Sequence, residues 1–205
     1  MNKSLCLGST VFVLLVFLTI SISFSSCAQK NNDPMKVTTD TISENDPSLL
    51  KAPTAPKGLY PREERQTAPF FELPYAKGGD FTLSDYLGNV ILLDFTATWC
   101  YWCDQQAPDV NAVVEKYNNQ KIKFFAINVR EAPEVVLEKY PAGEKTYPIL
   151  VDVLGDIIPL YDIQGFPTFV LIDLQGRIAY KQSGYDQNFT EKMSEMIDYL
   201  LLERN

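Results

Sequence analysis

The sequence predicts an α/β domain in which a mixed β-sheet is flanked by helices. Two patterns predict this class. Strand-like apolar runs alternate with segments of helical period between residues 70 and 161, and the chain then ends in a β-hairpin followed by an amphipathic helix. Strands and helices that alternate in this way pack as the layers of an α/β sandwich with a mixed sheet.

The first predicted elements are two short edge strands, Phe70–Leu73 and Phe81–Leu83, which form an N-terminal extension. The intervening Lys77–Asp80 has the composition of a turn. Val90–Thr96 follows as a nearly continuous apolar run, which is typical of a central strand covered on both faces. Ile122–Val129 is a second run of this kind.

The helix between these two central strands is predicted over Cys103–Tyr117, where apolar residues recur at helical spacing. Pro108 lies inside it and should kink it. A further helix over Pro133–Tyr140, with proline in its first turn, a short strand over Pro148–Val153 and a short helix over Ile157–Tyr161 come next.

The C-terminal part is predicted to be a hairpin of Thr168–Ile172 and Arg177–Gln182, in which Gly176 supplies the positive φ that the turn needs. The closing helix runs from about Thr190 to Glu203 and carries one apolar stripe. Asn188 and Glu191 have the spacing of a capping box at its start.

Residues 1–27 are interpreted as an export signal, because Lys3 precedes an apolar stretch and small residues precede Cys27. This ending resembles the lipobox of bacterial lipoproteins, although Phe24 stands where that pattern usually has leucine. The resemblance implies that Cys27 is lipidated. The alternative is an uncleaved membrane anchor over Leu5–Phe24. Both interpretations place the C-terminal domain outside the cytoplasm, on the periplasmic or extracellular side of the cell envelope.

Residues 28–67 are polar and rich in proline, so a disordered tether is predicted there, and residues 68–205 are predicted to form one domain. The formal net charge of the chain is -8. This balance argues against nucleic acid or an anionic membrane surface as a partner.

The residues that indicate a function are Cys100 and Cys103, which are separated by Tyr101 and Trp102 at the junction of a predicted strand and a predicted helix. A thiol in the first turn of a helix lies beside unpaired backbone N–H groups and the positive end of the helix dipole. This environment favours the thiolate, so the nearer sulfur becomes a nucleophile.

Three other interpretations of the cysteine pair are weaker. A zinc site needs four ligands, but the chain has no histidine and its other cysteines, Cys6 and Cys27, lie in the N-terminal segment. A structural disulfide over so short a loop would restrict the unfolded chain by only about 2 kcal/mol. Two inert core thiols would not explain the strand-to-helix position. A redox-active dithiol is therefore predicted.

Several spaced motifs resemble the thioredoxin superfamily and, within it, the membrane-tethered TlpA-type thiol-disulfide oxidoreductases. Ala68–Phe71 and Leu83–Gly88 are similar to the entry of that group, Leu93–Cys100 to its active-site strand, and Gly165–Thr168 to its cis-proline loop. The helix and strand predicted between residues 131 and 161 resemble the insertion that distinguishes the group. The resemblance covers nearly all of residues 68–205 and implies a thioredoxin-like fold.

The resemblance also implies roles for individual residues. Cys100 would attack, Cys103 would resolve, and Asp94 would be the buried acid that exchanges a proton with Cys103. An acid in a central strand is costly unless it has a partner or a function, which favours that role over a strand-end carboxylate. Pro167 would be cis and would place the backbone of Phe166 where an extended substrate segment can pair with it.

The two tryptophans beside the cysteines, Trp99 and Trp102, either cap the core or form an apolar rim where substrate proteins dock. Two other positions depart from the family pattern. Gln106 stands where TlpA-type reductases often carry an acid, and Ala126 stands where thioredoxin has a lysine near the buried acid. Asp94 is therefore expected to be buried without a compensating cation.

Reduction of disulfides in exported proteins is the function that the resemblance favours. It needs no diffusible cofactor and no metal, but it needs a membrane electron donor to restore the dithiol. A disulfide oxidase or isomerase would differ only in redox potential. A Cu(I) chaperone is disfavoured because histidine is absent and no methionine lies close to Cys100. A peroxidase is disfavoured because residues 92–114 contain no Lys or Arg.

Overall fold

The computed structural model describes residues 53–118, 120–141 and 145–203, which belong to a compact unit assigned to Ser48–Asn205. The predicted export signal, Cys27 and residues 28–52 of the predicted tether lie outside the described residues. In the part that the structure describes, no helix combines the length and the apolar character needed to cross a membrane.

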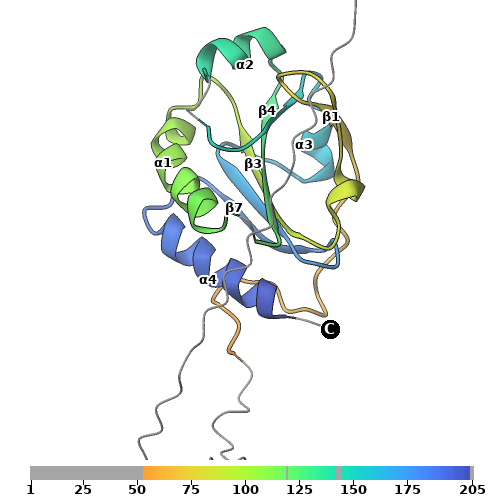
Figure 1. The fold of residues 1–205 in the computed structure, drawn as a ribbon, viewed down its shortest axis with the longest axis vertical. Coiled ribbons are helices and arrows are strands. Elements are labelled where there is room, and N and C mark those ends of the chain that lie inside the picture. Colours follow the sequence, from red (N-terminus) through yellow and green to blue (C-terminus); the bar gives the residue numbers. More distant parts are fainter. Residues whose placement is uncertain (1–52, 119, 142–144, 204–205) are drawn as a thin grey trace, which may run out of the picture. The chain divides into compact units, whose positions relative to one another are not determined.

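The core of the domain is a five-stranded sheet of described residues in the order β5-β4-β3-β6-β7. Figure 1 shows β3 and β4 side by side in it. Its strands are β3 (Val90–Thr96), β4 (Ile122–Val129), β5 (Ile149–Asp152), β6 (Thr168–Ile172) and β7 (Ile178–Ser183). β3, β4 and β5 pair in parallel, whereas β6 pairs antiparallel with both β3 and β7. The sheet is therefore mixed, as the sequence predicted, and β3 is its central strand.

A separate hairpin of β1 (Glu72–Pro74) and β2 (Asp80–Thr82) precedes the sheet. These strands lie one or two residues away from their predicted positions. Leu83, predicted to end the second strand, instead begins the 3-10 helix η2 (Leu83–Tyr86) and is fully buried. The difference is small because the apolar residues of short edge strands do not mark where backbone pairing stops.

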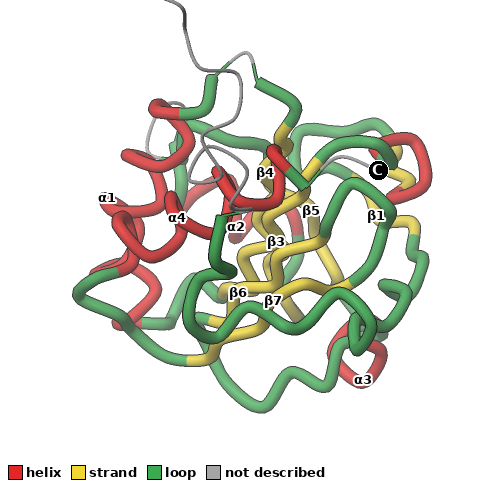
Figure 2. Tube along the Cα trace, turned by 90° about the horizontal axis from the view of Figure 1, so that it is seen from below, coloured by secondary structure: helices red, strands yellow, loops and turns green. Residues whose placement is uncertain are grey.

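In the described part of the chain, α-helices flank the sheet (Figure 2): α1 (Tyr101–Lys116), α2 (Pro133–Lys139), α3 (Ile157–Leu160) and α4 (Phe189–Leu202). α1 starts two residues earlier than predicted because Cys100 acts as its N-cap. The predicted capping box of α4 is wrong, since Asn188 makes no side-chain cap hydrogen bond and its backbone N–H instead donates to Asp186 at 2.9 Å.

The two faces of β3 contribute to two separate hydrophobic cores. Val90 and Leu92 pack with α1 and α4, whereas Ile91, Leu93 and Phe95 pack on the opposite side. All seven residues of β3 are buried, which confirms the prediction of a strand covered on both faces. Side chains alternate along a strand. Asp94 and Thr96 therefore face the α1 side, with Val90 and Leu92.

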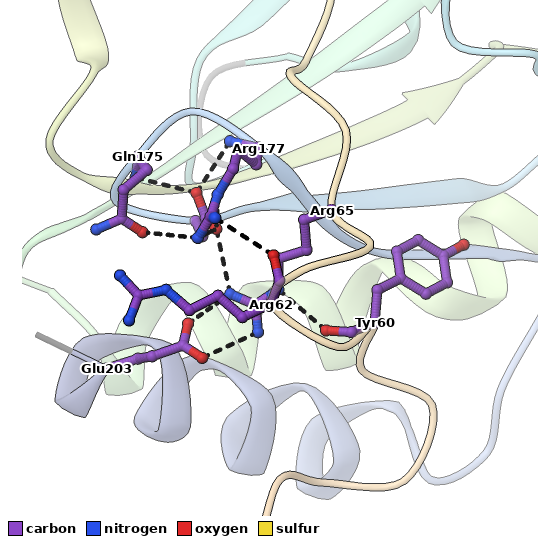
Figure 3. Close-up of polar contacts among 7 residues, drawn as sticks. Tyr60, Arg62, Arg65, Gln175, Arg177 and Glu203 are labelled. Atoms are coloured by element: carbon purple, nitrogen blue, oxygen red, sulfur yellow. Dashed lines mark hydrogen bonds and ion pairs between the residues drawn. The ribbon is translucent and has the colours of Figure 1, made fainter. Parts of the chain in front are cut away.

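The folded chain begins before residue 68, so the predicted end of the tether is wrong. Leu59 and Arg65 are buried, and the backbone N–H of Tyr60 donates to the carbonyl of Ala179 at 2.8 Å. Arg65 holds this segment in place through hydrogen bonds to Asp173 and Glu203 (Figure 3). The sequence pattern missed this because one buried arginine, and not an apolar period, fixes the segment.

Candidate active site

Cys100 and Cys103 form a disulfide at the N-terminus of α1, with 5.2 Å between their Cα atoms. Cys100 is the N-cap of the helix, and its sulfur accepts a hydrogen bond from the backbone N–H of Cys103 at 3.1 Å. β3 ends four residues earlier and directs the chain into this turn. The structure thus confirms that the two cysteines pair at a strand-to-helix junction.

An acidic residue that the sequence analysis missed, Glu131, fixes the turn before Cys100. Its carboxylate accepts hydrogen bonds from the backbone N–H of Thr98 at 2.7 Å and from the Thr98 hydroxyl. Arg130 has a φ of 60°, in the left-handed region that non-glycine residues rarely adopt, and it precedes Glu131 directly after β4. The position of Glu131 just past the carboxyl end of β4, the strand next to β3, was the sequence signal that could have identified it.

The peptide bond between Phe166 and Pro167 is cis, as predicted. Phe166 packs against a small cluster formed by Ala97, Cys100 and Cys103, so this loop lies beside the disulfide. Both segments line a pocket of about 390 Å³. Its lining residues come from the turn and from the loop before β6: Trp99, Cys100, Tyr101, Trp102, Gln164, Gly165 and Phe166.

Aromatic side chains surround this pocket and are largely open to solvent. Trp99 is 70% exposed, Tyr101 64% and Trp102 54%, so neither tryptophan caps the core. The ring of Trp99 contacts that of Phe166 with 5.9 Å between centroids, and Trp102 contacts Tyr185 at 5.5 Å. Tyr101 and Tyr185 extend the rim beyond the predicted residues. Tyr185 was missed because it follows β7, far from the cysteines in sequence.

Gln106 joins α1 to the loop after β7 that carries Tyr185. The Gln106 side chain is almost completely buried, donates to the carbonyl of Asp186 at 3.2 Å and accepts from the N–H of Asp186 at 2.7 Å. These paired hydrogen bonds hold the loop that carries Tyr185 against α1. A glutamine can both donate and accept, whereas a carboxylate at this position could only accept.

Asp94 is buried on β3, and two polar side chains bind its carboxylate. The hydroxyl of Tyr147 donates to its Oδ2 at 2.6 Å, and Nζ of Lys145 forms an ion pair with the same oxygen at 3.0 Å. Both residues come from the segment before β5. Asp94 lies opposite Ala126 in the β3–β4 register. A cation from another segment therefore compensates the charge of Asp94, so the expectation that Asp94 has no compensating cation is wrong.

The two tyrosines beside this ion pair remain protonated. Burial and the charge of Asp94 raise the pKa of Tyr147 well above its ordinary value. Burial also raises the pKa of Tyr140, and the negative charges of Asp104, Asp94 and Glu131 add to the effect. The Tyr147 hydroxyl is therefore a hydrogen-bond donor to the carboxylate across the physiological pH range.

Comparisons with known proteins agree with this geometry. The AhpC/TSA family model matches residues 65–181. The thiol-disulfide oxidoreductase ResA of Geobacillus kaustophilus (strain HTA426) is 36% identical over 115 residues, which are 55% of this chain and 64% of that protein. The chain thus spans less than two thirds of that relative's length.

Two solved structures are similar as well. One is a candidate thiol:disulfide interchange protein DsbE from Chlorobium tepidum, with a TM-score of 0.60 and 30% identity over 67% of this chain and 96% of that chain. The other is the exposed lipoprotein thioredoxin of Streptococcus pneumoniae strain TIGR4, with a TM-score of 0.56 and 25% identity over 64% of this chain and 100% of that chain. The family model covers more than half of the chain, so the protein belongs to the AhpC/TSA family, and it has a thioredoxin-like fold.

Proposed function

We propose that the protein is a thiol-disulfide oxidoreductase that reduces disulfides in exported proteins. The observation that carries this proposal is the Cys100–Cys103 disulfide in the first turn of α1, beside a pocket with an exposed aromatic rim. A disulfide at that position can be attacked and re-formed, because the helix N-terminus stabilises the thiolate that each step requires.

The reaction begins with the protein in its dithiol form. The Cys100 thiolate attacks one sulfur of a substrate disulfide, forms a mixed disulfide and releases the other substrate sulfur as a thiolate, which takes a proton from water. Cys103 then gives its proton to the Asp94 carboxylate and attacks the sulfur of Cys100. The second substrate sulfur leaves as a thiolate and takes a proton from water. The substrate has then gained two electrons, and Cys100–Cys103 is oxidised.

The substrate segment would lie in an extended conformation across the pocket. Pro167 has no backbone N–H, so pairing would use the backbone of Phe166. Trp99 and Trp102 would cover the apolar side chains next to the substrate disulfide. Their 70% and 54% exposure leaves that surface free for a partner.

The oxidised protein must be reduced again before a second turnover. The dithiol and Asp94 supply the redox chemistry, so we propose no diffusible cofactor. We propose a membrane electron donor that presents a dithiol of its own and takes the place of the substrate in the reverse reaction.

A lipid on Cys27 would hold the protein at the membrane on the outer side of the cell. Support comes from the small residues before Cys27 and from the solved relative named an exposed lipoprotein thioredoxin. Replacement of Cys27 by Ser should release the protein from the membrane fraction into the soluble exported fraction. Retention of the C27S variant in membranes would contradict lipid anchoring.

The decisive test of the activity is covalent trapping. In cells that produce the Cys103→Ser variant, substrate proteins should remain disulfide-linked to Cys100, because nothing resolves the mixed disulfide. The double variant Cys100→Ser, Cys103→Ser is the control and should trap nothing. Equal recovery from both variants would overturn the proposal. Equilibration with glutathione identifies the direction, since a potential near about -270 mV favours a reductase and one near about -120 mV an oxidase.

A further inference from the structure

Hydrogen bonds from β6 and β7 hold the end of the loop that lines the disulfide pocket. The Thr168 hydroxyl donates to the carbonyl of Gly165 at 2.7 Å, and its oxygen lies 2.6 Å from the Ser183 hydroxyl. A carbonyl can only accept, so the single hydrogen of the Thr168 hydroxyl is used there, and Ser183 donates to Thr168. The three groups therefore form a directed chain of hydrogen bonds from β7 to the loop.

Thr168 is a fixed point for this contact, whereas Gly165 is not. Thr168 is fully buried and begins β6, where it pairs with Phe95 of β3 on one side and with Ser183 of β7 on the other. Gly165 is exposed, and a side chain added there would meet no atom of the described residues within 4 Å, apart from its chain neighbours. Packing does not fix the Gly165 carbonyl, so its orientation depends on the hydrogen bond from Thr168.

The direction of the Phe166 N–H follows from that of the Gly165 carbonyl, because both belong to one peptide unit. This peptide bond is trans, so the carbonyl and the N–H lie in one plane and point in opposite directions. The carbonyl points to Thr168, and the N–H therefore points away from the start of β6. Among the residues that the structure describes, no acceptor binds the Phe166 N–H. Phe166 lines the disulfide pocket, so this donor is available to a bound segment.

We propose that Thr168 is a positioning residue for substrate binding: its hydroxyl, held by Ser183, orients the Gly165–Phe166 peptide so that the Phe166 N–H donates to a backbone carbonyl of the substrate. The inference rests on the proposed function, because that carbonyl belongs to the extended segment that carries the substrate disulfide. Thr168 does not line the pocket and acts only through this peptide. Disulfides within an extended backbone are thereby favoured over small disulfides that have none.

The test compares a disulfide that has a peptide backbone with one that has none. Thr168→Val removes the hydroxyl and keeps the branched shape of the side chain, whereas Thr168→Ser keeps the hydroxyl. One substrate is a linear peptide whose single cysteine is linked to 2-mercaptoethanol, and the other is 2-hydroxyethyl disulfide. Pre-reduced protein is mixed with excess disulfide in a stopped-flow instrument, and its oxidation is followed by tryptophan fluorescence.

The peptide concentration that gives half the maximal rate should rise roughly three- to tenfold in Thr168→Val, which is the usual effect of losing one hydrogen bond. The maximal rate with the peptide and the rate with 2-hydroxyethyl disulfide should keep their wild-type values. Thr168→Ser should restore the wild-type half-saturating concentration. Ser183→Ala should give a smaller rise than Thr168→Val, since it removes only the hydrogen bond that holds the Thr168 hydroxyl.

Thr82→Val is the matched control. Thr82 ends β2, makes no side-chain cap hydrogen bond and does not line the disulfide pocket, so this variant should match the wild-type protein with both disulfides. An unchanged half-saturating concentration of peptide in Thr168→Val would overturn the inference, and so would equal losses with the two disulfides. Inability of the wild-type dithiol to react with either disulfide would instead overturn the proposed function.

A second measurement leaves Thr168 in place. The peptide is linked to Cys100 in the Cys103→Ser variant, and exchange of the Phe166 amide hydrogen with solvent is followed by NMR. This hydrogen should exchange more slowly in the peptide-linked protein than in the free protein, because a substrate carbonyl accepts it. Equal exchange rates in the two forms would contradict the inference, even if Thr168→Val does not fold.

Discussion

Asp94 in β3 and Asp173 directly after β6 are both buried carboxylates, but they differ in the cations that hold them. Asp173 accepts hydrogen bonds from Arg65 Nη1 at 3.1 Å and from Arg177 Nε at 2.9 Å, and its Oδ1 accepts from the backbone N–H groups of Gln175 and Arg177. Asp94 is held by Lys145 and Tyr147.

The two carboxylates also differ in the chemistry of the side chains that bind them. Burial acts to raise the pKa of Asp173, but the hydrogen bonds from Arg177 and Arg65 outweigh it and hold this pKa below its ordinary value. Guanidinium groups do not deprotonate, so this carboxylate keeps a permanent charge. Two guanidinium groups therefore hold Asp173, whereas one ammonium and one hydroxyl hold Asp94.

Loss of Arg65 should give the largest effect on stability. Its side chain is 1% exposed and joins the segment before β1 to Asp173 and to Glu203 at the end of α4. Arg65→Met leaves these carboxylates without that cation, so the free energy of unfolding in urea should fall by about 3 kcal/mol.

The redox chemistry should survive this change, because Arg65 does not line the pocket beside the disulfide. The Arg65→Met protein should resolve mixed disulfides at the wild-type rate at a temperature where it is folded. Lys121→Met, at an exposed cation, is the stability control and should change the free energy of unfolding by less than about 0.5 kcal/mol. A slow Arg65→Met enzyme would show that the two regions are coupled.

The contribution of the Asp173 charge to stability should be visible in the pH dependence of the free energy of unfolding. Its pKa is lowered by folding, so the stability it contributes is present above its unfolded-state pKa of about 4 and is lost as the pH falls through the folded value. Asp173→Asn should therefore be less stable than wild type at pH 7, and the gap should narrow as the solution is acidified below about pH 4. A gap that stays constant with pH would mean that packing, and not charge, dominates.

The smallest effect is expected at the edge of the aromatic rim. Tyr185 is 44% exposed and contacts Trp102. Tyr185→Ala should raise the KM for a disulfide peptide with apolar flanking residues by at most about tenfold. Residues at the rim of an interface each contribute little to the binding free energy. Stability and the resolving rate should stay unchanged. An equal loss for a peptide with charged flanks would contradict an apolar docking role.

The strands of the sheet interior could be predicted from the sequence, and β3, β4 and β6 have the predicted bounds. Long apolar runs have one stable environment, the middle of a covered sheet. The hairpin of β1 and β2 and the start of α1 shifted by one or two residues, because edge pairing and capping depend on individual hydrogen bonds. The entry segment was misjudged because Arg65 finds its partners 108 and 138 residues further along the chain.

What the sequence determined by itself was local: the cysteine pair at a helix start, the acid within an apolar strand and the proline that follows Phe166. Each depends on neighbours in the chain, and such neighbours leave a recognisable spacing. Tertiary structure alone decided what surrounds them, since Glu131, Lys145, Tyr147 and Tyr185 reach the site from separate segments. Contacts between distant segments follow from how the layers pack, and no short spacing in the chain encodes them.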